Sequence, residues 1–416
     1  MNGCKAARRE SGDEMNIVLY VNCFLPIIGG REIVVHHLAG ALKELGHRVR
    51  VVGPAGLWSQ RHLRFGYPLH RFPTLLGGAF AEQEGLCKLL IDSTLWGCDV
   101  IHAHNTFPCG YAAARLKSIR NLPLVITPHG EDIHVIPEIG YGQRLDPVKR
   151  SKIGYALQRA ELVTAVSDSI EASLLDAGAH PAKIRKVPNG IDTERFQRPA
   201  GADVRRRLGL EGDARLIVTV GNYRPCKGHE VLIRSMPLIL SREPRARLVI
   251  VGKTADSLQS LAERLGLQNK VAFPGVVAFP IPSNGGAATG SSEPDWLAGI
   301  YQESEVYVSA GVGEGAEGMS LAMMEAMAAG LPVVATDISG NRDMVRHERT
   351  GFVVPPSDPV SLAEGVLRLL HSDGLRVRMG GESRRASDSY RWTGIARQYL
   401  NVYREARERS AARPLQ

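Results

Sequence analysis

The sequence predicts an α/β protein built from two doubly wound parallel-sheet domains. Three observations predict it: short β-branched runs alternate with helical patterns, the alternation breaks once at a turn-rich stretch, and it then resumes. Such alternation is typical of parallel sheets covered by helices on both faces. A chain of 416 residues is also long enough for two sizeable cores.

The first series of strands precedes the break. A polar, charged tail without the apolar stretch of a signal peptide is expected at 1–14. The helical pattern at 31–46 follows the first strand and ends at a glycine that can cap it. Buried strands are expected at 16–22, 48–53, 99–103, 123–127 and 162–166.

The second series follows the stretch 188–204, PNGIDTERFQRPAGADV, which is rich in turn formers and is the expected interdomain crossing. A small, polar insert at 281–295 predicts a loop, and the basic amphipathic pattern near the end of the chain predicts a helix. Strands are expected at 215–221, 247–252, 270–273, 305–309 and 332–336.

Charge and cysteine usage limit the partners and the compartment. A net charge of +8 and a pI near 9.2 favour nucleotides, phosphate groups or an acidic membrane face as partners, although a generally basic proteome explains them equally well. Six cysteines without a CxxC pair fit a reducing, cytoplasmic compartment. No window of about 18 uncharged apolar residues occurs, so no spanning helix is expected.

Two cations lie where an open parallel sheet binds ligands, beyond the carboxyl end of a strand. Arg224 and Lys227 come just after the strand at 215–221 and before a helical pattern. A guanidinium fork and an ammonium together suit a diphosphate. The alternative is that both are solvated surface charges.

The stretch EGAEGMSLAMMEA at 314–326 joins a glycine turn to a helix expected at 319–329. Amides near Gly318, Met319 and Ser320 would then lack helix partners, and together with the positive end of the helix they can hold a phosphate or a sugar oxygen.

Carboxylates flank the start of that helix. Glu317 precedes it, and Glu325 lies in its apolar run, where a carboxylate is costly unless it is paired or faces a polar ligand. Carboxylates accept hydrogen bonds from hydroxyl groups, as recognition of ribose or hexose requires. A capped helix with a solvated glutamate is the alternative.

Histidines end two neighbouring strands, in DVIHAHN and VITPHGEDIH. His102 and His104 form an HxH pair, which can bind a metal in some hydrolases, but no matching carboxylate spacing accompanies it. A structural role is therefore favoured for His102. His129, followed by a loop, is the better candidate for chemistry.

Taken in order, these segments resemble the family 4 glycosyltransferases, which have the GT-B fold, over essentially 15–400. The most specific is the last, because Glu317 and Glu325 match the family's paired glutamates. The family often has a bulky aromatic where this chain has Met319. The matching segments are FLPIIGGRE, HHLAGALKELGHRV, DVIHAHN, TPHGED, VPNGID, VGNYRPCKGHEVLI, LVIVG and EGMSLAMMEAMAAGLPVVAT.

The resemblance implies two Rossmann-like domains facing across a cleft: an acceptor-binding domain at 15–195 and a nucleotide-sugar-binding domain at 196–385. A C-terminal helix at 386–416 is expected to pack back on the first domain. The implied reaction transfers a hexose-type sugar from a nucleotide diphosphate sugar, with retention of configuration, in the cytoplasm. No cofactor, bound metal or nucleic acid is expected.

Residue roles follow from the resemblance alone. Arg224 and Lys227 would neutralise the leaving diphosphate, His129 would contact the sugar, and Gly30 would lie near the phosphates and the acceptor. The expected catalytic residues are Arg224, Lys227, His129 and Glu317.

The remaining roles concern the sugar and the ribose. Glu325 would hold the ribose. Glu317 would contact hydroxyls of the donor sugar, alongside the amides of Gly318, Met319 and Ser320.

The acceptor is expected to be a glycan, a lipid-linked or a small molecule. Basic residues at 61–72, including Arg61, Arg64 and Arg71, can meet lipid phosphates or an anionic glycan, with peripheral contact to an anionic membrane. The rival functions are a nucleotide-sugar epimerase of the same fold, a noncatalytic nucleotide-sugar-binding subunit, and a metal hydrolase built on His102, His104 and His129.

Overall fold

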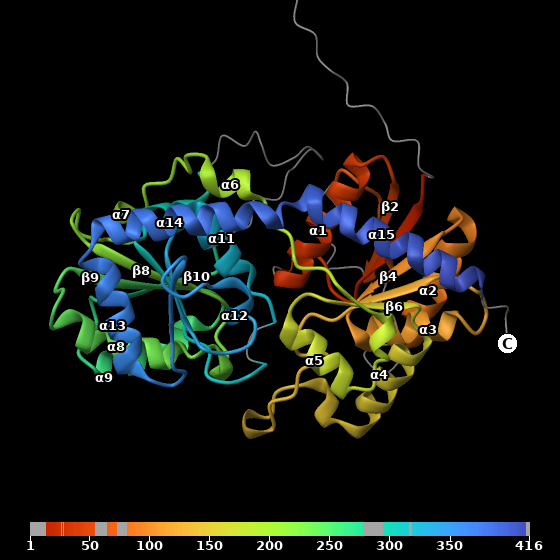
Figure 1. Ribbon diagram of the computed structural model, residues 1–416, viewed down its shortest axis with the longest axis horizontal. Coiled ribbons are helices and arrows are strands. Elements are labelled where there is room, and N and C mark those ends of the chain that lie inside the picture. The colour runs from red at the N-terminus through yellow and green to blue at the C-terminus, as the bar shows by residue number, and fades with distance from the viewer. Residues whose placement is uncertain are drawn as a thin grey trace, which may run out of the picture.

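Two parallel sheets form two α/β domains, which confirms the predicted fold class (Figure 1). The computed structural model describes residues 14–25, 27, 29–54, 65–72, 81–277, 294–315 and 318–412. The first domain runs from red to yellow in Figure 1, and the second runs from green to blue.

The first sheet has the strand order β3-β2-β1-β4-β5-β6-β7, with every neighbouring pair parallel. Its strands are β1 (Asn16–Tyr20), β2 (Arg48–Pro54), β3 (Leu69–Phe72), β4 (Val100–His104), β5 (Leu124–Thr127), β6 (Leu162–Ala165) and β7 (Ile184–Lys186). Its helices are α1 (Gly30–Glu44), α2 (Ala81–Trp96), α3 (Tyr111–Leu116), α4 (Pro147–Arg159), α5 (Asp168–Asp176) and, on the way to the second domain, α6 (Thr193–Gln197).

Alternating side chains of the first sheet pack into two different cores. Ile17 and Leu19 of β1 face the core that α1 supplies, whereas Val18 and Tyr20 face the core that α3, α4 and α5 supply. A period of two along a strand produces this division, and helices on both faces bury the whole sheet.

The second sheet has the order β10-β9-β8-β11-β12-β13, also entirely parallel. Its strands are β8 (Arg215–Val220), β9 (Ala246–Val251), β10 (Val271–Gly275), β11 (Val306–Ser309), β12 (Val333–Thr336) and β13 (Gly351–Val354). Its helices are α7 (Val204–Arg207), α8 (His229–Leu240), α9 (Gln259–Arg264), α10 (Trp296–Glu303), α11 (Leu321–Ala329), α12 (Asn341–Met344), α13 (Pro359–Leu370) and α14 (Asp373–Ser387).

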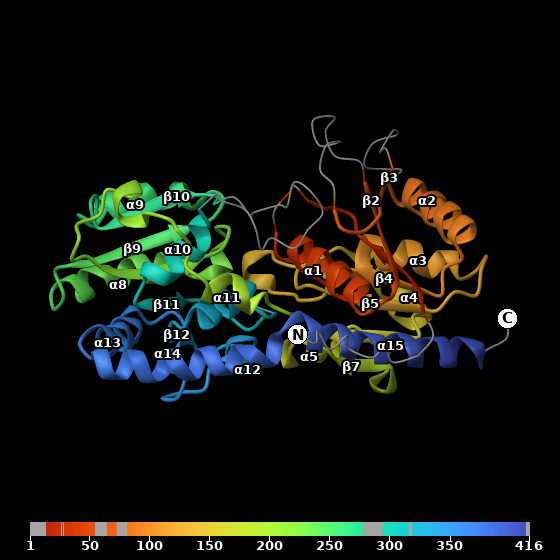
Figure 2. The same ribbon diagram turned by 90° about the horizontal axis from the view of Figure 1, so that it is seen from above.

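The last helix, α15 (Trp392–Ala411), belongs to the core of the first domain. It follows α14 along the edge of both domains (Figures 1 and 2) and packs on α1. Its first residue, Trp392, lies so close to Gly190 that a Cβ there would come within 2.4 Å of the indole ring. The glycine of the VPNGID segment therefore lets the returning helix pack where the chain leaves the first domain.

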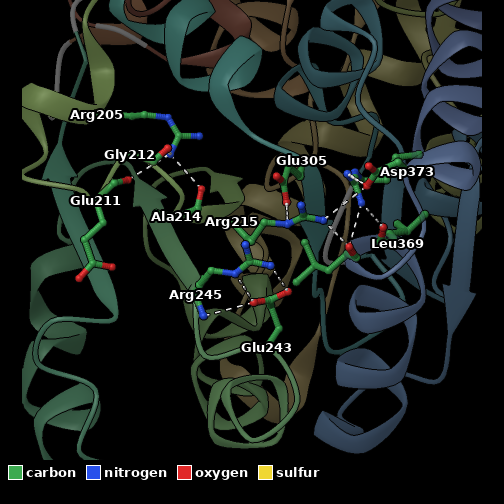
Figure 3. Close-up of polar contacts among 12 residues, drawn as sticks. Arg205, Glu211, Gly212, Ala214, Arg215, Glu243, Arg245, Glu305, Leu369 and Asp373 are labelled. Atoms are coloured by element: carbon green, nitrogen blue, oxygen red, sulfur yellow. Dashed lines mark hydrogen bonds and ion pairs between the residues drawn. The ribbon is translucent and has the colours of Figure 1, made fainter.

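Many arginines of this basic chain are used in structural ion pairs. At the amino ends of β8 and β9, Arg215 lies 2.9 Å from Glu305 and Arg245 lies 3.1 Å from Glu243 (Figure 3). Arg205 donates there to three backbone carbonyls (Figure 3). This network is at the edge of the sheet opposite the expected ligand edge, and its arginines are bound by groups of the chain itself, so they are no evidence for an anionic ligand there.

Several predictions fall outside the described residues. They are the tail except its last residue, the insert at 281–295 except its last two residues, Glu317, Arg61 and Arg64. Arg71 is described, and it donates to the backbone carbonyl of Leu25 at 3.3 Å. No helix among the described ranges has the length and apolarity to cross a bilayer.

Candidate functional site

The predicted site residues of the second domain follow two adjacent strands. In the second sheet, β8 and β11 are neighbours from which the strand order continues in opposite directions. Loops at the carboxyl ends of such a strand pair diverge and leave space for a ligand. Arg224 and Lys227 follow β8, and Gly318, Met319 and Ser320 follow β11.

Arg224 and Lys227 flank a short turn between β8 and α8. Arg224 is about half exposed, and its Nη1 lies 3.0 Å from Oε2 of Glu131 in the first domain. Its guanidinium also lies 5.7 Å from the centre of the Tyr141 ring. Lys227 ends the 3-10 turn, and Gly228 is the N-cap of α8. The arginine is thus at the interdomain boundary, with a carboxylate as its counterion.

The helix after β11 begins two residues later than predicted. Ser320 is its N-cap and accepts from the Met323 amide at 3.3 Å, so Gly318 and Met319 belong to the preceding turn. Its hydroxyl satisfies one helix donor, which a serine does well at this position. The turn contacts the first domain, because a Cβ on Gly318 would lie 3.4 Å from Ile170.

Gly30 begins α1 and faces the second domain. A Cβ placed on this exposed glycine would lie 3.5 Å from Leu321 Cδ1, the first residue of α11. The N-termini of one helix from each domain therefore approach each other. Both ends carry partial positive charge, so an anion between them is favoured from both sides.

Glu325 is 5% exposed on α11 and accepts a hydrogen bond of 2.9 Å from the hydroxyl of Tyr301. Burial raises the pKa of this carboxyl to about 7, while the charge of Arg195 and the Tyr301 hydrogen bond act in the opposite direction. The apolar run predicted a costly carboxylate, and the tyrosine is its partner within the chain.

A pH dependence of folding stability follows for Glu325. Its pKa in the folded state, about 7, exceeds the usual 4.5, so the folded protein binds this proton more tightly than the unfolded chain does. The contribution to stability is complete below pH 4.5 and is lost as the pH rises through about 7. In Glu325→Gln, we expect a smaller fall in unfolding free energy between pH 5 and pH 8, measured by urea titration. An unchanged slope would contradict the shifted pKa.

His129 lies in the loop after β5 and is partly exposed. Its backbone amide and that of Gly130 donate to Asp132 Oδ1 at 2.9 and 3.1 Å. Burial, together with the charge of Arg31, lowers the pKa of the His129 imidazole well below its usual value. The ring is therefore neutral at physiological pH, and it can donate or accept a hydrogen bond.

The histidine pair of β4 is engaged within the protein. His102 contacts the Tyr403 hydroxyl at 2.8 Å through Nδ1 and the Thr127 hydroxyl at 2.7 Å through Nε2. Neither nitrogen is then available to a metal. Across the described ranges, no group of three His, Cys, Asp or Glu side chains has an arrangement that could hold a metal ion.

Family models match both domains of the chain. A model described as Glycosyltransferase Family 4 matches residues 28–195, and one described as Glycosyl transferases group 1 matches residues 214–372. An uncharacterized glycosyltransferase of Methanocaldococcus jannaschii is 30% identical over 395 residues, which cover 92% of this chain and 96% of that protein. This chain belongs to the family 4 glycosyltransferases.

Other similar proteins agree with this membership. A GDP-mannose-dependent alpha-(1-6)-phosphatidylinositol monomannoside mannosyltransferase of Mycolicibacterium smegmatis is 29% identical and covers 94% of this glycosyltransferase and all of that protein. The crystal structure of Anabaena HepE in complex with UDP and glucose has 21% identity and a TM-score of 0.74, covering 93% of this chain and 99% of that one. The structural likeness confirms the GT-B fold.

Two residues of this glycosyltransferase were missed as site candidates. Glu131, the counterion of Arg224, lies within the quoted TPHGED segment, whose spacing alone indicated only His129. His134 is buried, and its Nδ1 forms a hydrogen bond of 2.7 Å with Ser173 Oγ. Its ring lies next to Gly315 of the second domain. Sequence patterns could have marked both as polar residues after a strand, but not their partners across the domain boundary.

Proposed function

We propose that this glycosyltransferase moves a hexose-type sugar from a nucleotide diphosphate sugar to a hydroxyl of a glycan, lipid-linked or small-molecule acceptor, with retention of configuration and without a bound metal. The observation that carries the proposal is the approach of the α1 and α11 N-termini, together with Arg224 and Lys227 in the loop after β8, the strand next to β11. This arrangement concentrates positive potential where a diphosphate would lie.

Departure of the nucleoside diphosphate is the step that these groups would assist. The bond between the anomeric carbon and the phosphate oxygen breaks, and negative charge grows on that oxygen. Arg224, Lys227 and the amides near Gly318 would stabilise it, because donors fixed in advance cost no reorganisation during the reaction. The new bond to the acceptor oxygen would form on the same face, and the acceptor proton would pass to the departing phosphate.

Hydrogen bonds from the protein would hold the transferred sugar and the ribose of the donor. Glu325 would accept a hydrogen bond from a ribose hydroxyl, and Glu317 would accept hydrogen bonds from hydroxyls of the transferred sugar. His129 would contact that sugar from the first domain. The name of the mycobacterial relative contains GDP-mannose and a phosphatidylinositol mannoside. A purine nucleotide sugar and a lipid-linked acceptor are therefore the first substrates to assay. Contact with an anionic membrane stays a prediction.

The test is thermal stability with UDP, GDP, ADP and their hexose conjugates, each with and without EDTA. A ligand at a hundred times its dissociation constant should stabilise the protein by about 2.7 kcal/mol. We expect one base to raise Tm, the rise to survive EDTA, and Lys227→Ala to abolish it. A product with inverted configuration, or a rise that EDTA removes, would contradict the proposal.

A further inference from the structure

A row of aromatic rings connects the C-terminal helix with His129. Tyr403 of α15 contacts His102 Nδ1 at 2.8 Å, and the ring centres of His102 and His104 are 4.0 Å apart. His104 Nδ1 then lies 3.1 Å from His129 Nε2. His104 has no place in the function proposed above, although it is completely buried beside a residue that does.

The ring of His104 contacts two other imidazole rings. His102 is fixed at both nitrogens, and its ring lies against that of His104 with 37° between the two planes. His104 also stacks with His129, at 5.4 Å between ring centres and 25° between ring planes. A side chain confined in this way can impose a hydrogen-bond geometry on its neighbour.

Only one proton can lie between the two rings. Burial lowers the pKa of His104 and of His129 well below the usual value, and the charge of Arg31 acts in the same direction on both. Both imidazoles are therefore neutral. In a neutral pair, one ring donates and the other accepts, and the choice decides which nitrogen of His129 carries hydrogen.

The other ring nitrogen of His104 indicates which of the two imidazoles donates the hydrogen bond. Its Nε2 is buried and has no hydrogen-bond partner among the described residues. If His129 donated to His104, the proton of His104 would have to lie on that nitrogen, which would leave a buried N–H unsatisfied. Orphaned buried donors are rarer than under-used acceptors, so the reverse arrangement is favoured.

We propose that His104 is a positioning residue: it donates its Nδ1–H to His129 Nε2 and holds His129 in the tautomer protonated at Nδ1. The inference rests on the proposed function in that the Nδ1–H of His129 would be the group offered to a hydroxyl oxygen of the donor sugar. His104 itself touches no substrate.

The first experiment reads the tautomer without any ligand. In protein labelled with ¹⁵N-histidine, long-range ¹H–¹⁵N spectra distinguish protonated from unprotonated ring nitrogens, and His129→Gln assigns the signals. We expect His129 to be protonated at Nδ1. His104→Asp, whose carboxylate can only accept, should move that proton to Nε2. Protonation of Nε2 in the unsubstituted protein would overturn the inference, whether or not the protein binds a nucleotide sugar.

A matched pair of variants then tests the consequence. In His104→Asn, the side-chain amide can donate from nearly the position of Nδ1, whereas the leucine side chain of His104→Leu, of similar size, cannot. With hydrolysis of GDP-mannose and UDP-glucose as the readout, kcat should stay within about threefold in the asparagine variant. It should fall about 10- to 100-fold in the leucine and aspartate variants, by analogy with the loss found when a partner that orients a metal-bound histidine is removed. Equal losses in the asparagine and leucine variants would refute positioning.

Discussion

Replacement of Arg224 by alanine is expected to lower kcat by about 10²–10³-fold, the loss measured when one preorganised donor to a developing oxyanion is removed. Arg224 lies at the carboxyl end of β8, half exposed, and its guanidinium is within 3.0 Å of the Glu131 carboxylate. A diphosphate offers more negative charge and more acceptor oxygens than one carboxylate, so it can displace Glu131. The cation then acts on the leaving group as charge develops there.

Arg242→Ala is a close control for this substitution. Arg242 is also about half exposed and also pairs with one half-exposed glutamate, Glu364, but it lies at the end of α8 remote from the proposed site. Loss of such a surface pair costs about 0–1 kcal/mol and should leave kcat unchanged. Steady-state transfer and single-turnover donor cleavage would both be measured. If the Arg224→Ala variant still bound donor and kept kcat within about threefold, the proposed stabilisation of the leaving diphosphate by Arg224 would be wrong. The Arg224–Glu131 contact would then be only an ion pair between the domains.

Gly228→Ala is expected to be the most damaging single substitution for folding near the site. Gly228 has φ +65°, and a Cβ there would lie 1.8 Å from the backbone oxygen of Ala310. The left-handed backbone costs about 1–3 kcal/mol for a residue with a side chain, and displacement of packed groups adds about 1–3 kcal/mol. Neither residue can move easily, since Gly228 is the N-cap of α8 and Ala310 directly follows β11.

Gly209→Ala separates these two costs. Gly209 has φ +62°, almost the same backbone, but a Cβ there would meet nothing within 4 Å. Denaturant unfolding of both variants should show a larger loss of unfolding free energy for Gly228→Ala, and the difference measures the clash. Because the turn at Pro225–Lys227 precedes Gly228, that variant should also bind donor nucleotide more weakly. Equal losses in the two variants would contradict the expected close packing against Ala310.

Strand prediction succeeded in the centre of each sheet and failed mainly at the edges. Central strands such as β8 and β9 are covered on both faces, so their sequences, RLIVTV and ARLVIV, are mostly apolar. The strands β3, β7 and β13 were not predicted, and each is the last strand at an edge of its sheet, whereas the edge strand β10 was predicted. An edge strand such as β7, IRK, is short and partly exposed, and its sequence is therefore no more apolar than a loop.

The helix after β11 illustrates a boundary that propensity cannot place. Apolar residues run from Met319 onward, so the pattern predicted a start there, but the serine at 320 caps the helix and moves its start to Leu321. Met319 instead packs between the domains, where Asn189 Nδ2 donates to its carbonyl at 3.4 Å. Its apolar side chain serves that interface and not the helix.

The fold class, the family and the strand ends at which the candidate residues gather could all be predicted from the sequence, because hydrophobic periodicity and local motifs are properties of neighbouring residues. The partners of these residues became known from the folded chain: Glu131 for Arg224, Tyr301 for Glu325 and His104 for His129. The members of these pairs are 93, 24 and 25 residues apart in the chain. Contacts over such separations depend on how strands are ordered and how domains meet, and no local pattern encodes either.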